Sequence, residues 1–146
     1  MLESDELVAQ LKKDYPDFIF KSGSRFAFRP PKTIIIGPYE GKNTPLLLFH
    51  ELGHALSKKY SYNLSVERLK IESLAWQAGK TAYLACQKSG NYPNLPPWNE
   101  TFVEDNLDTY RNWLHQKSTC KSCGLTMYQS KDKTWSCPFC EHFNSL

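Results

Sequence analysis

The sequence predicts an α+β fold, in which helices and a small sheet form one domain and a cysteine-rich module follows at the C-terminus. Three observations support this. Short β-branched and aromatic runs come first, segments with helical periodicity follow, and two Cys-x-x-Cys pairs fall within the last 30 of 146 residues. This length suits one domain with a small appendage, so we predict domains at residues 1–116 and 117–146.

The composition is that of a folded chain. Charged residues make up 23% and hydrophobic residues 40%, which excludes a disordered protein. No apolar run approaches the ~20 residues of a membrane-spanning helix, and the acidic N-terminus does not resemble a secretory signal. We therefore expect a cytoplasmic protein without membrane contact. The net charge of +3 is too small to identify a nucleic-acid partner.

The N-terminal elements are predicted from caps and turns. Ser4 is expected to cap a helix that ends before Tyr15-Pro16, because the residue before proline avoids helical angles. Three strand-like runs follow, with Ser22-Gly23-Ser24 as the turn between the first two. We expect a small antiparallel sheet made of residues 18–20, 25–28 and 33–36.

Three further helices are expected. The first begins at Thr44, which precedes a proline at the first helical position, and runs to Lys59. The second is capped by Ser65 and runs to Lys88, where a Ser-Gly pair stops it. The third covers about residues 100–116, where apolar side chains recur at helical spacing: Phe102, Val103, Leu107, Tyr110, Trp113 and Leu114.

The segment His50-Glu51-Leu52-Gly53-His54 carries the strongest chemical signal. Residues four apart lie on one helix face, so His50 and His54 can direct two imidazoles at one metal ion. Glu51 lies one step round, where a carboxylate can act as a general base without occupying the metal. Gly53 costs about 1 kcal/mol against alanine in a helix, which we interpret as a sign that another segment passes close by. The alternative is a surface helix that happens to hold two histidines.

A catalytic zinc usually takes three protein ligands, so the motif requires one more. Helical projection places Glu72 at the edge of an apolar face, four residues before Trp76, and a buried carboxylate there needs a cation. We predict Glu72 as the third ligand. Glu67 also faces inward, but its interaction with the helix dipole explains it without a metal. The other histidines, His115 and His142, lie at the end of a helix and in the cysteine cluster.

His50-Glu51-Leu52-Gly53-His54-Ala55, followed 18 residues after His54 by Glu72-Ser73-Leu74-Ala75-Trp76, resembles the pattern of gluzincin peptidases of the ImmA/IrrE type. The resemblance covers about residues 18–85. It implies a zincin-like domain with a small sheet and active-site helices, in which His50, His54 and Glu72 bind zinc and Glu51 is the base.

Four cysteines near the C-terminus predict a zinc ribbon. Cys120 and Cys123 form one pair, Cys137 and Cys140 form the other, and the 13 residues between the pairs suit two short strands. In a reducing compartment such pairs are metal ligands rather than disulfides, and four thiolates make a closed, structural zinc site. Metal binding supplies the folding free energy that so small a module lacks.

The ribbon connects the chain to a second family. SprT-like peptidases, which include the Spartan proteases of DNA–protein crosslink repair, also join His-Glu-x-x-His to a C-terminal zinc ribbon. Their third ligand is a histidine soon after the motif, and this chain has none between His54 and His115. The resemblance to SprT-like peptidases therefore concerns the architecture, and the resemblance to gluzincins concerns the ligands.

The ribbon's surface allows two interpretations. Its lysines and aromatic residues suit contact with DNA or RNA. The interpretation that we favour is that the aromatic residues form a miniature core. The residues concerned are Lys121, Lys131, Lys133, Tyr128, Trp135 and Phe139.

These features predict a metallopeptidase with one catalytic and one structural zinc ion, which hydrolyses a protein or peptide substrate. A protein associated with nucleic acid is one candidate substrate. The alternative is a non-catalytic zinc adaptor that binds nucleic acid or protein through the ribbon. The strand at 33–36 either holds an extended substrate at the sheet edge or packs in the core. Candidates for an oxyanion donor are Tyr60, Tyr62, Arg68 and Tyr83, with none favoured.

Overall fold

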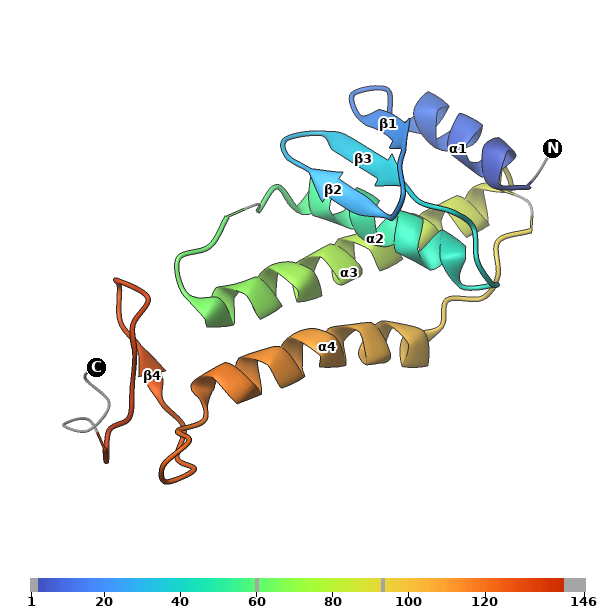
Figure 1. The fold of residues 1–146 in the computed structure, drawn as a ribbon. Helices are drawn as coiled ribbons and strands as arrows, with labels where there is room; N and C mark the ends of the chain where they lie inside the picture. The colour runs from blue at the N-terminus through green and yellow to red at the C-terminus, as the bar shows by residue number, and fades with distance from the viewer. Residues whose placement is uncertain (1–2, 60, 93, 141–146) are drawn as a thin grey trace.

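The computed structural model describes residues 3–59, 61–92 and 94–140, with side chains from residue 5 onward. Within these ranges the chain forms four helices and five strands, which confirms the predicted α+β class (Figure 1). In this part of the chain, no helix is both long enough and apolar enough to span a bilayer.

Helix α1 (Glu3–Asp14) opens the fold. Ser4 lies inside its first turn, so the prediction that Ser4 precedes the helix as its cap is wrong. Leu7 and Leu11 are buried in the core, and the Tyr15 N–H closes the last turn on the Leu11 carbonyl at 2.8 Å. The helix stops there, as predicted, because the next residue is a proline.

A three-stranded sheet follows, made of β1 (Ile19–Ser22), β2 (Ala27–Arg29) and β3 (Thr33–Ile36). Its order is β1-β3-β2, with β3 parallel to β1 and antiparallel to β2. The predicted antiparallel sheet is therefore wrong for the β1–β3 pair, and the sheet is mixed.

The predicted hairpin turn at residues 22–24 is a crossover. The Gly23 N–H bonds the Ile36 carbonyl at 2.9 Å, so the chain continues along β3 before it turns. It then crosses the end of β3 at Gly37, where a Cβ atom would lie 2.7 Å from the Phe26 nitrogen. Because Gly37 has no side chain, the crossing segment can pass close to the strand and reach its other side.

Strand β3 is the centre of the sheet. Ile34 and Ile35 are buried, which confirms that this strand packs in the core. Its suggested role as a substrate-binding edge is wrong, because both of its sides are already paired. In the described part of the chain, β2 is paired on one side only and leaves an open edge.

Three long helices complete this part of the chain: α2 (Thr44–Ser57), α3 (Ser65–Ser89) and α4 (Glu100–Ser118). Figure 1 shows the sheet on one side of α2 and the helices α3 and α4 on the other. The core forms between these layers. Its largest fully buried side chains include Leu46, Leu48, Phe49, Leu52 and Tyr83.

Helices α2 and α3 begin at Thr44 and Ser65, the residues predicted to cap them, so each observed cap lies one residue earlier than predicted. Asn43 occupies the cap position of α2, and Thr44 instead bonds the backbone of the preceding loop. At the start of α3, the Glu67 carboxylate accepts a 3.0 Å hydrogen bond from the Leu64 N–H, so Ser65 is not the cap. This bond gives Glu67 a role in the helix start.

Helices α2 and α3 cross with their backbones in contact. A Cβ atom on Gly53 would lie 1.9 Å from the Ala75 carbonyl oxygen, and one on Gly79 would lie 2.5 Å from the Phe49 oxygen. This confirms that another segment passes close to Gly53, and the segment is α3. Glu72 lies within one turn of Ala75, so the crossing brings its side chain over the histidines of α2.

The C-terminal module begins where α4 ends, at Ser118. Strands β4 (Tyr128–Gln129) and β5 (Trp135–Ser136) pair antiparallel, as predicted for the ribbon. The Gln129 side-chain oxygen accepts a 2.6 Å hydrogen bond from the Ser65 N–H, which ties the module to the start of α3. The predicted boundary at residue 116 falls in the last turn of α4, and the division into two domains stays a prediction.

Candidate metal centres

Metal-binding side chains gather at two places in the described part of the chain. One group is His50, Glu51 and His54, and the other is the set of four cysteines. In each group the ligand atoms lie within 4.8 Å of one another. The fold and these groups define an α+β protein with two candidate metal centres, both compatible with zinc.

Aromatic side chains from two other elements hold the histidine rings in place. The centroids of the His50 and His54 rings lie 4.7 Å apart on α2. Trp76 of α3 stacks on His50 at 4.1 Å with an interplanar angle of 4°. Phe28 of β2 stacks on His54 at 6.0 Å and 8°. The two imidazoles are therefore oriented by the sheet on one side and by α3 on the other.

Glu72 lies against both histidines. Its Oε1 atom is 3.0 Å from Nε2 of His50, and its Oε2 atom is 3.2 Å from Nε2 of His54. Sequence analysis predicted this proximity from the burial of the Glu72 carboxylate, and the side chain is indeed only 8% exposed. The structure thus adds Glu72 to the group formed by the motif residues.

Two atoms of this cluster are buried without a hydrogen-bond partner among the described residues: Nε2 of His50 and Oε1 of Glu72. They lie close together but lack the alignment that a hydrogen bond requires. Leaving such atoms unsatisfied costs about 1–3 kcal/mol each. Two imidazole nitrogens and a carboxylate oxygen that converge in this way fit the donor set of a zinc site.

In the histidine cluster, the carboxylates and the imidazoles stabilise each other's charged forms. Burial lowers the pKa of His50, but the carboxylates of Glu51 and Glu72 raise it by a larger amount. The net result is a pKa raised to about 9. Burial raises the pKa of Glu72, but the neighbouring His50 and His54 imidazoles lower it by more, to about 2. At neutral pH the metal-free cluster therefore holds an ionised Glu72 beside a protonated His50, and a metal cation can replace that proton.

Glu51 is placed differently from Glu72. Its Oε2 atom lies 3.4 Å from Nδ1 of His50, the ring nitrogen that Glu72 does not approach. The side chain is as buried as Glu72, yet it lines the same cleft as the histidines. Glu51 thus approaches the His50 ring at Nδ1, whereas Glu72 approaches the Nε2 atoms of both histidines.

A cleft of about 480 Å³ opens onto the histidine cluster, between β2, α3 and α4. Tyr62 and Arg68 line this cleft, whereas Tyr83 is buried in the core and donates its hydroxyl hydrogen bond to the Pro96 carbonyl. Tyr60 lies outside the described residues. Two of the four suggested oxyanion donors therefore line the cleft.

The position of Tyr110 at the cleft is not predicted by the sequence. The helical pattern of α4 predicts only that Tyr110 faces inward, whereas in the structure it lines the same cleft as the histidines. Burial raises the pKa of Tyr110, and the neighbouring Glu72 carboxylate raises it further. A period of 3.6 residues predicts which side chains face inward. It does not predict that one of them meets a cluster on two other helices.

The four cysteines form a compact cluster at the base of the β4–β5 hairpin. Cys123 Sγ lies 3.5 Å from Cys137 Sγ, and the Cys140 N–H donates to Cys137 Sγ at 3.2 Å. All four are free thiols. Desolvation, followed by the effect of Cys123 and Cys137, raises the pKa of Cys140 to about 12. Four thiolates can therefore coexist here only beside a cation, as in the predicted zinc ribbon.

The ribbon's aromatic residues do not form the predicted miniature core. Phe139 is 72% exposed and Tyr128 is 48% exposed, and only Trp135 is half-buried. Among the described residues, Met127 is the partly buried hydrophobic side chain that packs on the cysteines. The cysteines themselves occupy the centre of so small a module, so Phe139 and Tyr128 remain at its surface.

Comparisons of the chain with protein-family models, with curated proteins and with solved structures found no match. The resemblance to gluzincin and SprT-like peptidases therefore depends on the motif residues, and the geometry of the two centres carries the functional argument.

Proposed function

We propose that the chain is a zinc-dependent metallopeptidase with its catalytic metal at His50, His54 and Glu72. One observation carries the proposal. A buried carboxylate from α3 lies 3.0 Å and 3.2 Å from the Nε2 atoms of two histidines on α2. Three protein ligands of this kind leave the fourth zinc position to water or substrate, which is typical of catalytic rather than structural sites.

Glu51 is proposed as the general base. Held by His50, His54 and Glu72, a zinc ion would supply Lewis acidity for a substrate carbonyl and would lower the pKa of water to near neutral. The Glu51 carboxylate lines the cleft beside the ligands, where it can take a proton from the water and return it to the leaving amine. Tyr110, whose raised pKa keeps it protonated, is a candidate hydrogen-bond donor to the developing oxyanion.

The open edge of β2 is proposed to hold the substrate. Ala27 and Phe28 of this strand line the cleft, so an extended peptide paired with β2 would run past the histidine cluster. This role replaces the one that sequence analysis suggested for β3, which lies inside the sheet. Backbone pairing would position the scissile carbonyl without requiring a particular side chain.

The test compares wild-type protein with Glu51→Gln, both loaded with zinc, on a library of internally quenched fluorescent peptides. We expect the variant to keep its fold and two zinc ions per chain and to lose hydrolysis by at least about a hundredfold, the usual contribution of a general base. Metal content is measured by mass spectrometry and the fold by circular dichroism. Equal cleavage by both proteins would disprove the assignment of Glu51.

A second candidate function is a non-catalytic zinc adaptor, and the exposure of Phe139, Tyr128 and Leu125 on the ribbon favours it. Exposed aromatic residues of this kind suit contact with a protein or with nucleic-acid bases. The adaptor hypothesis predicts one zinc ion per chain, which is lost in Cys120→Ser. Two zinc ions in wild-type protein, one of which survives in Cys120→Ser, would favour the peptidase.

A further inference from the structure

Three cationic side chains line the cleft next to the histidine cluster: Arg25, Lys59 and Arg68. The ion pairs found among the described residues involve none of the three. The anions that line the same cleft, Glu51 and Glu72, lie against the histidines. The cleft thus contains positive charge that the metal cluster does not use.

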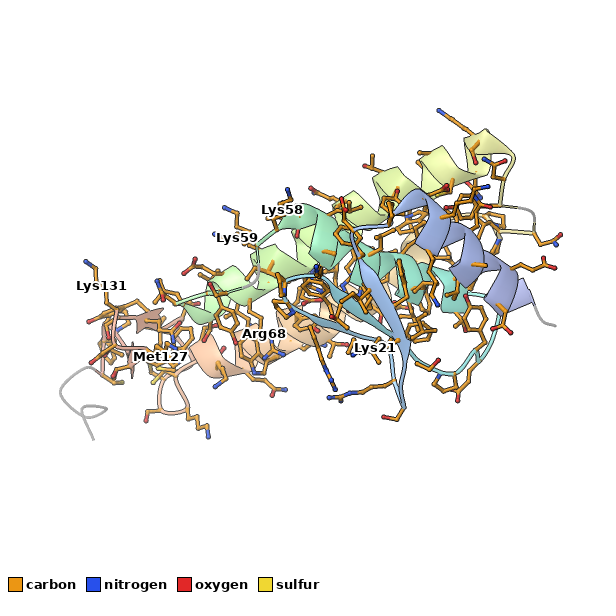
Figure 2. The ribbon with its side chains drawn as sticks, turned by 90° about the horizontal axis from the view of Figure 1, so that it is seen from above. Lys21, Lys58, Lys59, Arg68, Met127 and Lys131 are labelled. Atoms are coloured by element: carbon orange, nitrogen blue, oxygen red, sulfur yellow. The ribbon has the colours of Figure 1, made fainter. Side chains whose placement is uncertain are left out.

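Arg68 is the best placed of these cations. Its guanidinium carbon lies 5.3 Å from the centroid of the Tyr110 ring and 5.1 Å from that of Trp113, both on α4. These contacts hold the half-buried side chain across the gap between α3 and α4. Figure 2 labels Arg68 on α3 and Lys59 just after α2. Lys59 is exposed. The backbone hydrogen bond from Leu64 is the main cause of the lowered pKa of Glu67, and the positive charge of Lys59 lowers it further.

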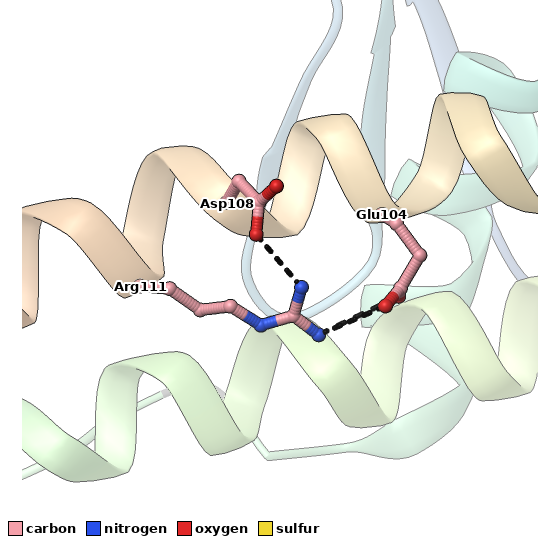
Figure 3. Close-up of polar contacts among 3 residues, drawn as sticks. All are labelled: Glu104, Asp108 and Arg111. Atoms are coloured by element: carbon pink, nitrogen blue, oxygen red, sulfur yellow. Dashed lines mark hydrogen bonds and ion pairs between the residues drawn. The ribbon is translucent and has the colours of Figure 1, made fainter.

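Arg111 on α4 differs from Arg68, because carboxylates accept the hydrogen bonds of its guanidinium. Its Nη1 atom donates to Asp108 at 2.9 Å, and its Nη2 atom lies 3.3 Å from Glu104 (Figure 3). Both carboxylates come from the same helix. Among the described residues, Arg68 has aromatic neighbours in place of such carboxylates, so its N–H groups stay available to a ligand in the cleft.

We propose that Arg68 is a specificity-determining residue that binds a carboxylate of the peptide substrate. A guanidinium offers paired N–H donors that match the two oxygens of a carboxylate, and its stacking on Tyr110 and Trp113 orients it before the ligand arrives. Arg25 and Lys59 add positive potential along the same cleft. This inference rests on the proposed function only in taking the ligand to be a peptide.

The charge distribution favours a peptide over a nucleic acid. A polyanionic strand is usually bound along a continuous track of cations, whereas the ring contacts described for this cleft hold one cation, Arg68, in place. A peptide with one acidic group can place that group on Arg68 and present an uncharged backbone to the metal cluster. The carboxylate can belong to an Asp or Glu side chain or to the C-terminus of the peptide, and the experiment separates these two sources.

The experiment measures binding rather than cleavage. Fluorescein-labelled alanine-based octapeptides carry one Glu at successive positions, each with a Gln counterpart and each with a free or an amidated C-terminus. Their dissociation constants for zinc-loaded Glu51→Gln protein are determined by fluorescence anisotropy. The same set is measured for Arg68→Gln, for Arg68→Lys and for Arg111→Gln, all in the Glu51→Gln background.

We expect Glu peptides of one particular spacing, or all peptides with a free C-terminus, to bind at least about tenfold more tightly than their uncharged counterparts, the effect of one charge-assisted hydrogen-bonded pair. Arg68→Gln should abolish the difference, Arg68→Lys should retain part of it, and Arg111→Gln should leave it unchanged. All variants should keep two zinc ions and a circular dichroism spectrum equal to that of the parent, and Arg68→Lys serves as the test if Arg68→Gln fails to fold.

Equal binding of charged and uncharged peptides would overturn the inference, as would a preference that survives in Arg68→Gln. Binding of oligothymidylate that depends on Arg68, without any peptide preference, would overturn it in favour of a nucleic-acid site. If wild-type protein cleaves peptides without a carboxylate preference, the peptidase proposal survives and this inference fails. If carboxylate selectivity is found without cleavage, this inference survives and the peptidase proposal fails.

Discussion

The two candidate metal centres are built from sequence segments of similar length, but their surroundings differ. The cysteine ligands span residues 120–140 and are supported by two-residue strands and by Met127. The histidine cluster spans residues 50–72 and lies at the crossing of α2 and α3, against a large hydrophobic core. We expect the ribbon to fold only when it binds metal, whereas the helical part is expected to fold without metal and to position the histidine cluster.

Losing the ribbon's metal should therefore have the largest effect on folding. Zinc bound by four cysteines contributes an apparent 10–16 kcal/mol or so in small zinc domains. In Cys137→Ser, we expect loss of one zinc ion and unfolding of residues 119–140, while the helices stay folded. Zinc content, together with hydrogen exchange resolved along the chain, measures both effects.

Cys86→Ser is the matched control, because Cys86 is buried in the helical part and is remote in sequence from the ribbon. This variant should keep both zinc ions and protected ribbon amides. A ribbon that remains protected from exchange in Cys137→Ser would contradict the idea that its metal makes its fold.

Removing a ligand from the histidine cluster should have a smaller effect on folding and a large one on metal binding. In Glu72→Gln, we expect the zinc affinity of this centre to fall by more than about a hundredfold, since even indirect partners of a metal ligand contribute 10–100-fold. Competition with a chelator of known affinity measures the loss, and thermal unfolding of the metal-free protein reports the fold.

Glu67→Gln tests whether the effect is specific to the ligand. Glu67 lies on the same helix, but its carboxylate bonds the Leu64 N–H at the helix start. A glutamine can make the same bond, so this variant should keep both zinc ions at wild-type affinity. Unchanged zinc affinity in Glu72→Gln would remove the basis of the proposed peptidase.

The smallest expected effect comes from the helix crossing itself. In Gly53→Ala, the new methyl group would overlap the Ala75 carbonyl, so the helices must move apart. Overpacking of this kind costs typically 1–3 kcal/mol in the free energy of unfolding. Since Glu72 moves with α3, we also expect weaker zinc binding at the histidine cluster.

Gly41→Ala provides the comparison for this variant. Nothing lies within 4 Å of the added methyl group, and its positive φ of 91° makes backbone strain the main cost. Both variants should lower the unfolding temperature, but Gly41→Ala should leave zinc affinity unchanged. Equal zinc affinities in the two glycine variants would show that the crossing does not control the metal site.

The local elements could be predicted from the sequence, but their pairing could not. The predicted ends of the helices lie within a few residues of the observed ones, because prolines, glycines and apolar periodicity act within one or two turns. The sheet was predicted as antiparallel because Ser22-Gly23-Ser24 has the composition of a tight turn. Which strand lies beside β1 depends on the path over Gly37, and no local pattern encodes that path.

The amino-acid sequence alone was sufficient to place two imidazoles on one helix face and four thiols in two knuckles, because helix geometry and the Cys-x-x-Cys spacing are local. It also indicated, from the neighbours of Glu72, that a carboxylate would be buried nearby. The contacts of Trp76, Tyr110 and Arg68 with this region became evident only in the tertiary structure. They depend on how closely α2, α3 and α4 approach, and the packing of side chains far apart in the chain determines that distance.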